Sequence, residues 1–199
     1  MNAMAGRGTL ILVVGPSGAG KDSIIAGAAE RFRGDPRVVF ARRIITRPVS
    51  DGGERHAAVS PGEFSKWREA GRLMLHWQAH GFEYGLSHEL AQKLEAGCSI
   101  IANVSRTVVG EARRRFPPVT AIAVAASAAT LAGRLALRNR ETAAEITQRL
   151  ERADTLCEHP DVIIDNDGAL SLAIDRFVEV VRQAVETPAL PAPTFRPVA

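Results

Sequence analysis

Gly15-Pro16-Ser17-Gly18-Ala19-Gly20-Lys21-Asp22-Ser23 is the stretch that decides how this chain folds. An apolar run at residues 9–14 precedes it and is typical of a buried strand, and residues 24–29 continue it as the first turns of a helix. The glycines let successive backbone N–H groups point inward, and the helix N-terminus adds a positive dipole. This G-x-x-x-x-G-K spacing between a strand and a helix predicts a nucleotide phosphate site. A tight strand-to-helix turn that binds nothing is the alternative.

Lys21 is expected to reach the β- and γ-phosphates of a nucleoside triphosphate. The next residue in such loops is Ser or Thr, whose hydroxyl holds Mg²⁺, and here it is Asp22. Asp22 is therefore a candidate metal ligand, directly or through water, and Ser23 is a candidate for the missing hydroxyl. The alternative is that Asp22 is only an acidic residue favoured by the helix dipole, in which case it would oppose nearby phosphates.

Composition narrows the class of protein. A length of 199 residues fits one domain with a real core, and 22 of the 25 basic residues are Arg. Arginine's planar fork suits phosphate, although a compositional bias of the genome also explains an arginine excess. Only 5% of residues are aromatic and no RNA-binding motif is present, which argues against a nucleic-acid partner.

Nothing in the sequence indicates a membrane or an oxidising compartment. Cys98 and Cys157 form no C-x-x-C pair and lie in apolar surroundings, so we expect buried, reduced thiols. No apolar segment is long enough to span a bilayer, and the N-terminus lacks the apolar core of a signal peptide. We therefore expect a cytoplasmic protein, and the sequence leaves a homodimer open.

The pattern of strands and helices predicts an α/β fold with three layers. Strands expected at residues 9–14, 38–45, 98–104, 119–126 and 161–165 alternate with helices, which favours a five-stranded parallel core sheet. A further strand is expected at 73–80, with a turn at 81–85 and a helix before it that begins in a Ser60/Glu63 capping box. The proline-rich residues 187–199 are expected to form a mobile tail after a domain at 1–186.

Polar residues gather in three places that favour ligand binding. Asn103, Ser105 and Arg106 follow a buried strand, where open α/β sheets bind their ligands. The side chains of His76, Gln78 and His80 share one face of an extended strand, as a polar substrate wall, a plain surface or, less favourably at this spacing, a metal site. The arginines between residues 134 and 152 form either a phosphate clamp or a surface paired with Glu141, Glu145 and Glu151.

Several of these pieces together resemble the guanylate kinase-like P-loop family over nearly the whole chain, from about residue 9 to 185. They are the loop at 15–21, Thr46-Arg47-Pro48, Tyr84-Gly85, Arg134 with Arg138 and Arg149, and the late strand that ends at 165–167. The resemblance implies an ATP site, a small substrate-binding region at about 42–86 and a mobile arginine lid at about 134–149.

Three departures separate the chain from guanylate kinases. The family's base-reading carboxylate falls at Leu75, its tyrosine before the capped helix falls at His56, and its hydroxyl after Tyr-Gly falls at Leu86. Leucine cannot satisfy the donors of a guanine edge, so guanylate phosphorylation is not expected.

The remaining motifs look like one branch of the family, the ribose 1,5-bisphosphate phosphokinases of phosphonate degradation. They are Gly-Lys-Asp-Ser at 20–23, Ile-Thr-Arg-Pro at 45–48, Gly-Gly-Glu at 52–54, His-Trp-Gln-Ala-His-Gly at 76–81 and Asn-x-Ser-Arg at 103–106. Asp22 is expected in this branch. The resemblance implies that ATP phosphorylates ribose 1,5-bisphosphate, a small phosphosugar, to give 5-phosphoribosyl 1-diphosphate.

The resemblance also implies roles for individual residues. Residues 15–23 would hold Mg·ATP, and Asn166 would contact adenine. The residues that would act on the transferring phosphoryl group are Lys21 and the lid arginines Arg134, Arg138 and Arg149, and Arg140 is a weaker candidate for the same role. Arg47 is the first candidate for an acceptor phosphate. The other acceptor candidates are Arg43, Arg55, His56, Gln78, His80, Tyr84, Asn103 and Arg106. The competing functions are a nucleoside monophosphate kinase, guanylate kinase in particular, and a catalytically silent binding module of the same fold.

Overall fold

The computed structural model describes residues 6–48, 56–136 and 159–186. A five-stranded sheet forms its centre, in the order β2-β7-β1-β8-β9, and every pairing is parallel. The strands are β1 (Leu10–Val14), β2 (Val38–Phe40), β7 (Ser99–Asn103), β8 (Val119–Ala125) and β9 (Val162–Asp165). The predicted parallel core sheet is therefore confirmed, and its central strand β1 is apolar because both of its faces are covered.

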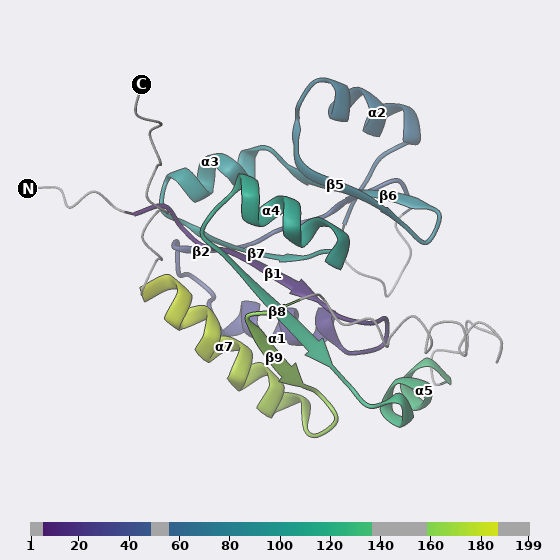
Figure 1. Ribbon diagram of the computed structural model, residues 1–199, viewed down its shortest axis with the longest axis vertical. Coiled ribbons are helices and arrows are strands. Elements are labelled where there is room, and N and C mark those ends of the chain that lie inside the picture. Colours follow the sequence, from purple (N-terminus) through teal and green to yellow (C-terminus); the bar gives the residue numbers. More distant parts are fainter. Residues whose placement is uncertain (1–5, 49–55, 137–158, 187–199) are drawn as a thin grey trace, which may run out of the picture.

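Helices cover both faces of this sheet and complete the three layers (Figure 1). The helices α1 (Lys21–Arg31) and α7 (Leu170–Glu186) pack on one face, where Ile24 and Phe177 share a cluster with Ile11 and Ile122. The helices α3 (Glu89–Glu95) and α4 (Val109–Arg115) cover the other face; a short 3₁₀ helix, η1 (Arg106–Val108), leads into α4, and α5 (Ala128–Ala136) follows β8.

A second, four-stranded sheet was not predicted as such. Its order is β4-β3-β6-β5, with β3 (Ile44–Ile45), β4 (Ala57–Ala58), β5 (Leu73–Ala79) and β6 (Phe82–Ser87), and it carries helix α2 (Pro61–Glu69). Two expectations were wrong here. Residues 38–45 are not one strand, because Val38–Phe40 pair with β7 whereas Ile44 and Ile45 pair with β6. Residues 82–85 are not a turn, because they form part of an antiparallel hairpin with β5.

Local signals around this second sheet were more reliable. Ser60 and Glu63 form the predicted capping box at the start of α2: the Ser60 side chain accepts from Glu63 N, and the Glu63 carboxylate accepts from Ser60 N. Ser87 is the last residue of β6 and its Oγ accepts a bond from Glu89 N at 3.3 Å; α3 begins at Glu89, with His88 as its N-cap.

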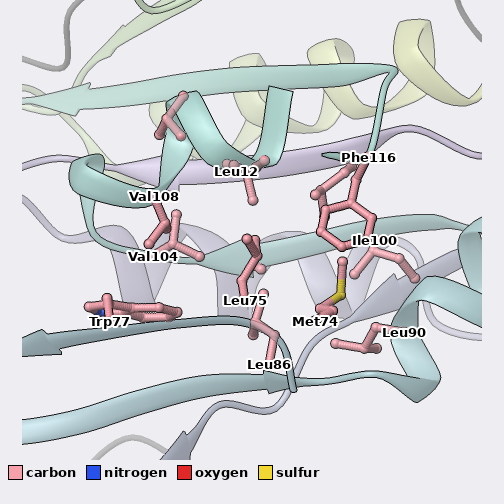
Figure 2. Close-up of a cluster of buried hydrophobic side chains, with 14 of the residues drawn as sticks. Leu12, Met74, Leu75, Trp77, Leu86, Leu90, Ile100, Val104, Val108 and Phe116 are labelled. Atoms are coloured by element: carbon pink, nitrogen blue, oxygen red, sulfur yellow. The ribbon is translucent and has the colours of Figure 1, made fainter. Parts of the chain in front are cut away.

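The two sheets share one hydrophobic core. Figure 2 shows Met74, Leu75 and Leu86 of the β5–β6 hairpin directed toward side chains of the first sheet and of η1, among them Leu12, Ile100 and Val108. We call this side of the second sheet its inner face. The opposite side, its outer face, is covered by α2, whose Phe64 packs on Ile44 and Leu73.

Two further observations concern membrane spans and the cysteines. No helix within the described ranges combines the length and the apolar character that a bilayer span requires. Cys98 is half-buried rather than buried and its thiol lies 3.5 Å from the carbonyl oxygen of Pro36, while Cys157 lies outside the described residues.

Candidate active site

The loop at residues 15–23 follows β1 and leads directly into α1, as its sequence predicted. Gly15, Gly18 and Gly20 all have positive φ angles, of 140°, 89° and 90°, which side-chain-bearing residues rarely adopt. The loop also lies close to its neighbours: a Cβ on Gly15 would stand 2.3 Å from the carbonyl oxygen of Val124, and one on Gly20 would stand 2.3 Å from Asn166 Nδ2. Backbone shape and close packing both require glycine at these two positions.

Lys21 is the first residue of α1 and folds back over the loop. Its Nζ donates to the carbonyl oxygens of Gly15, at 2.7 Å, and Pro16, at 2.8 Å. The ammonium therefore lies at the loop that the G-x-x-x-x-G-K spacing predicted as a phosphate site.

Asp22 and Asn103 are brought together although 81 residues separate them. Asn103 ends β7, the strand next to β1, and its Nδ2 donates to Asp22 Oδ1 at 2.7 Å. Asn103 is nearly buried, whereas Asp22 and Ser23 in the first turn of α1 are exposed. Two predicted site residues from different parts of the chain thus lie in contact.

Asn166 and Arg134 support the loop from its other side. Asn166 directly follows β9, is 1% exposed, and its Nδ2 donates to the carbonyl oxygen of Ala19 at 2.7 Å. Arg134, from α5, donates to the carbonyl oxygens of Asn166, at 2.7 Å, and Ala19, at 3.4 Å. The Asn166 amide nitrogen is thus bound to the loop backbone, and the expected contact of Asn166 with adenine stays a prediction.

The turn after β9 is tied to α5 through a carboxylate. Asp167 Oδ1 accepts a hydrogen bond from Ser127 N at 2.8 Å, and this bond, followed by one from the Thr130 hydroxyl, lowers the pKa of Asp167 below its usual value. This tie holds the start of α5 beside the Asn166 segment, and so helps to place Arg134 at the loop.

A second group of candidates lies on the inner face of the second sheet. The Arg43 guanidinium lies 5.5 Å above the ring of Tyr84, which in turn stacks on Trp77 with ring centroids 5.5 Å apart. The Arg47 guanidinium lies 6.0 Å from the ring of Phe82. Alternation along the strands places both arginines on one face, because Ile45 between them packs into the same inner core.

Arg47 has one feature that points to an anion. Its Nε is buried, and within the ranges that the structure describes this N–H has no hydrogen-bond acceptor. A buried donor without a partner is costly, and phosphate oxygens are the acceptors that suit an arginine fork.

His56 is buried beneath this segment rather than open to a ligand. It is 2% exposed and its Nε2 lies 2.8 Å from the carbonyl oxygen of Arg47, so that nitrogen carries a proton and donates. Arg42 in turn donates to the carbonyl oxygen of His56 at 2.8 Å. The structure places His56 behind Arg47, and its expected contact with the acceptor stays a prediction.

Gln78 and His80 are not brought into this group. Gln78 pairs with Glu83 across the hairpin, and Glu83 reaches Arg68 of α2 at 3.0 Å, so both side chains belong to the outer face. His80 lies in the hairpin turn, beyond the end of β5, with a φ of 51°. His76 and Gln78 are exposed on one face of β5, as an extended strand predicts, whereas His80 lies beyond the end of the strand. A contact of Gln78 or His80 with the acceptor stays a prediction. No group of three metal-binding side chains is found in the described part of the chain.

The other predicted residues divide into two sets. Arg106 is exposed at the start of η1, three residues after Asn103. Arg55, Arg138, Arg140 and Arg149 lie outside the described residues. Sequence reasoning missed Phe82, the ring beside Arg47, and Trp77, which stacks on the Tyr84 ring beneath Arg43. For Trp77 the alternation of apolar and polar residues at 75–78 was the available signal.

Comparisons with known proteins are consistent in pointing to one family. The family model described as guanylate kinase matches residues 7–186. A protein named ribose 1,5-bisphosphate phosphokinase PhnN from Thiobacillus denitrificans is 44% identical over 181 residues, which cover 89% of this chain and 95% of that protein. One of the same name from Acidiphilium cryptum is 44% identical over 188 residues, covering 94% of this chain and all of that protein.

The fold is also found among solved structures. A guanylate kinase from Anaplasma phagocytophilum superposes with a TM-score of 0.65 at 17% identity, over 90% of this chain and 87% of that one. At that identity the likeness shows the fold alone.

Proposed function

The chain belongs to the guanylate kinase family, and from this premise we propose that it is a ribose 1,5-bisphosphate phosphokinase. An oxygen of the acceptor's 1-phosphate forms a bond to the γ-phosphorus of ATP, and the bond from that phosphorus to the β–γ bridging oxygen breaks. The products are 5-phosphoribosyl 1-diphosphate and ADP, the reaction that a phosphonate-degradation pathway would use. The two relatives that carry this name, 44% identical over nearly their whole length, support this proposal.

The observation that carries the choice of acceptor is the character of the inner face. It presents the guanidinium groups of Arg43 and Arg47 over aromatic rings. Glu83, the one carboxylate of strands β3, β5 and β6, lies on the outer face with Arg68. A guanine edge requires acceptors for its N–H groups, whereas a sugar with two phosphates requires cations. The face suits the second ligand.

The two leucines that replace polar residues of guanylate kinases support the same choice. Leu75 and Leu86 are cross-strand partners, and both are fully buried in the core that the two sheets share (Figure 2). Neither offers an acceptor to a base, and the apolar cluster around them leaves a purine without a polar partner there.

On the donor side, the backbone amides of residues 15–20 and the Lys21 ammonium would hold the phosphates of ATP. Mg²⁺ would neutralise charge on those phosphates when bound, and the oxygen-rich first turn of α1, with Asp22 and Ser23, offers the ligand type that it prefers. Arg134 already lies against the loop through Ala19, which fits a role at the transferring group.

The acceptor phosphate is itself an anionic nucleophile, so the reaction needs alignment and charge neutralisation more than a general base. The proposal therefore assigns catalysis to Lys21 and to arginines, and it keeps residues 42–86 as the acceptor region and 134–149 as the lid. The proposal includes a cytoplasmic location, since ATP is the donor.

A coupled assay for ADP release tests the proposal, with ribose 1,5-bisphosphate and GMP as competing acceptors. We expect kcat/KM for ribose 1,5-bisphosphate to exceed that for GMP by at least about a hundredfold, because a buried polar group left unpaired costs roughly 1–3 kcal/mol for each group. Faster turnover of GMP would replace the proposal with a guanylate kinase. Failure to bind ATP in a thermal-shift experiment would instead favour a silent binding module.

A further inference from the structure

The contact between Asp22 and Asn103 carries an inference beyond the identity of the acceptor. In P-loop enzymes, Mg²⁺ is held by the hydroxyl of the residue after the loop lysine and by an aspartate of another strand. Here the residue after Lys21 is the acid, and the strand that pairs with β1 ends in an amide, Asn103. The two side chains are hydrogen-bonded at 2.7 Å.

We propose that Asp22 and Asn103 are an exchanged pair, in which the metal-holding carboxylate has moved from the strand end to the helix and the strand residue positions it. This inference rests on the proposed function only in assuming that a metal–nucleotide complex binds at the loop. Asp22 is the candidate ligand, and Asn103 is a positioning residue that acts through it.

The geometry of the pair fits a ligand role for Asp22 and a positioning role for Asn103. Asn103 is 9% exposed and is fixed by β7, whose neighbours β2 and β1 flank it on both sides. Its amide takes one carboxylate oxygen of Asp22, and within the described residues Asp22 Oδ2 accepts no hydrogen bond. Asp22 itself is exposed in the first turn of α1, beside the loop. One oxygen is thus held by the protein, and the other is left for a cation or its water.

A metal-holding role for this pair and a purely structural hydrogen bond between α1 and β7 predict different results. A tie would affect folding and nucleotide binding equally with and without metal. A helix N-terminal acid that merely opposes phosphate would, once removed, let ADP bind more tightly under both conditions. If Asp22 and Asn103 are an exchanged pair, replacing either one affects ADP binding only when metal is present. Swapping the two roles back, with a hydroxyl at residue 22 and an aspartate at residue 103, should then restore metal binding.

The test measures binding of Mn²⁺ to the full-length protein with ADP, from the electron paramagnetic resonance signal of free Mn²⁺. Asp22→Ser should weaken Mn²⁺ binding by about tenfold to a hundredfold, the range seen when groups that hold or orient a metal are removed. Asn103→Ala should weaken it by about tenfold. The double variant Asp22→Ser/Asn103→Asp restores the usual arrangement of hydroxyl and aspartate, and should recover affinity to within about threefold of the wild type.

Two controls accompany these variants. Asp175→Asn removes one exposed carboxylate of α7, which pairs with Arg31 at 3.1 Å, and should leave Mn²⁺ binding unchanged. ADP affinity in EDTA should change less than threefold in all variants, and circular dichroism should show that each one is folded.

The inference is overturned if Asp22→Ser binds Mn²⁺ as the wild type does, or if the double variant binds it no better than Asp22→Ser alone. It is also overturned if Asp22→Ser tightens ADP equally with and without Mn²⁺. Because the probe contains no acceptor, a protein that shows the expected Mn²⁺ pattern but does not phosphorylate ribose 1,5-bisphosphate would refute the proposed function and leave this inference standing.

Discussion

Replacing Arg47 by alanine should weaken binding of the acceptor far more than binding of ATP. The Arg47 guanidinium lies over Phe82 on the inner face of the second sheet, its carbonyl oxygen is held by His56, and its Nε is buried without an acceptor in the described chain. The phosphate loop is built from different elements, β1 and α1. A phosphate at Arg47 would satisfy the buried N–H, so we expect the arginine to contribute to binding the acceptor and not to holding the donor.

The size of the effect follows from the chemistry of that contact. A hydrogen bond to a charged group is worth about 1.5–3 kcal/mol, and each 1.4 kcal/mol is about tenfold in an equilibrium constant. Arg47→Ala should therefore raise the KM for ribose 1,5-bisphosphate by roughly 10- to 150-fold. Arg47→Lys keeps a charge but loses the planar fork and the Nε–H, so it should recover only part of the loss.

Steady-state kinetics with each substrate varied in turn separates the two effects. Arg72→Ala is the control, because Arg72 also lies over an aromatic ring, Trp67, but is exposed and belongs to the outer side of the sheet. It should leave both KM values within about twofold, a change well below one kcal/mol. An equal rise in the KM for ATP and for the acceptor in Arg47→Ala would remove Arg47 from the acceptor site.

Three further predictions concern the donor loop, the core and the pH dependence of stability. Lys21→Ala should abolish turnover with an unchanged circular dichroism spectrum, and full activity would refute the phosphate-loop assignment. Leu75→Glu should lower the free energy of unfolding by several kcal/mol in a denaturant titration without conferring GMP phosphorylation, since it buries an unpaired charge in a fully enclosed position. Because hydrogen bonding lowers the pKa of Asp167, its contribution to stability is present above the usual carboxyl pKa and is lost as pH falls through the folded-state value. The difference in Tm between the wild type and Asp167→Ala should therefore be largest near neutral pH and shrink below about pH 4; a constant difference would contradict this reasoning.

The core sheet and the loop could be predicted because their signals are local. Residues 10–14 and 99–103 are continuous apolar runs, as strands buried on both faces must be, and the glycines at 15, 18 and 20 report backbone angles directly. The second sheet could not be predicted in the same way. Residues 82–85 carry two breakers nearby, Gly81 and Gly85, and they become a strand only through pairing with β5 and β3, which no local pattern contains.

The site was predicted in its residue types better than in its geometry. Asp22 and Asn103 were both candidates, but for different ligands, and their contact depends on β1 and β7 being neighbours. His56 was one of the acceptor candidates, and its burial and its contact with the Arg47 carbonyl oxygen could not be predicted from its place in the sequence. The spacing of residues in the sequence indicates which side chains are of a type that can bind phosphate. Their burial, which only the fold determines, decides which of them are accessible to a ligand.

The two departures at residues 75 and 86 explain how one fold can change its acceptor without changing its donor. Leu75 and Leu86 face each other across the hairpin and join the core beneath the inner face, so polar replacements there would disturb the packing of both sheets together. The phosphate loop, in contrast, contacts Val124 of β8, Asn166 in the turn after β9 and Arg134 of α5. Because these contacts involve no residue of the hairpin, selection can act on the acceptor face while the donor loop stays intact. Recovering guanylate activity should thus require replacing the paired leucines together, with polar partners for both, and not a single carboxylate at residue 75.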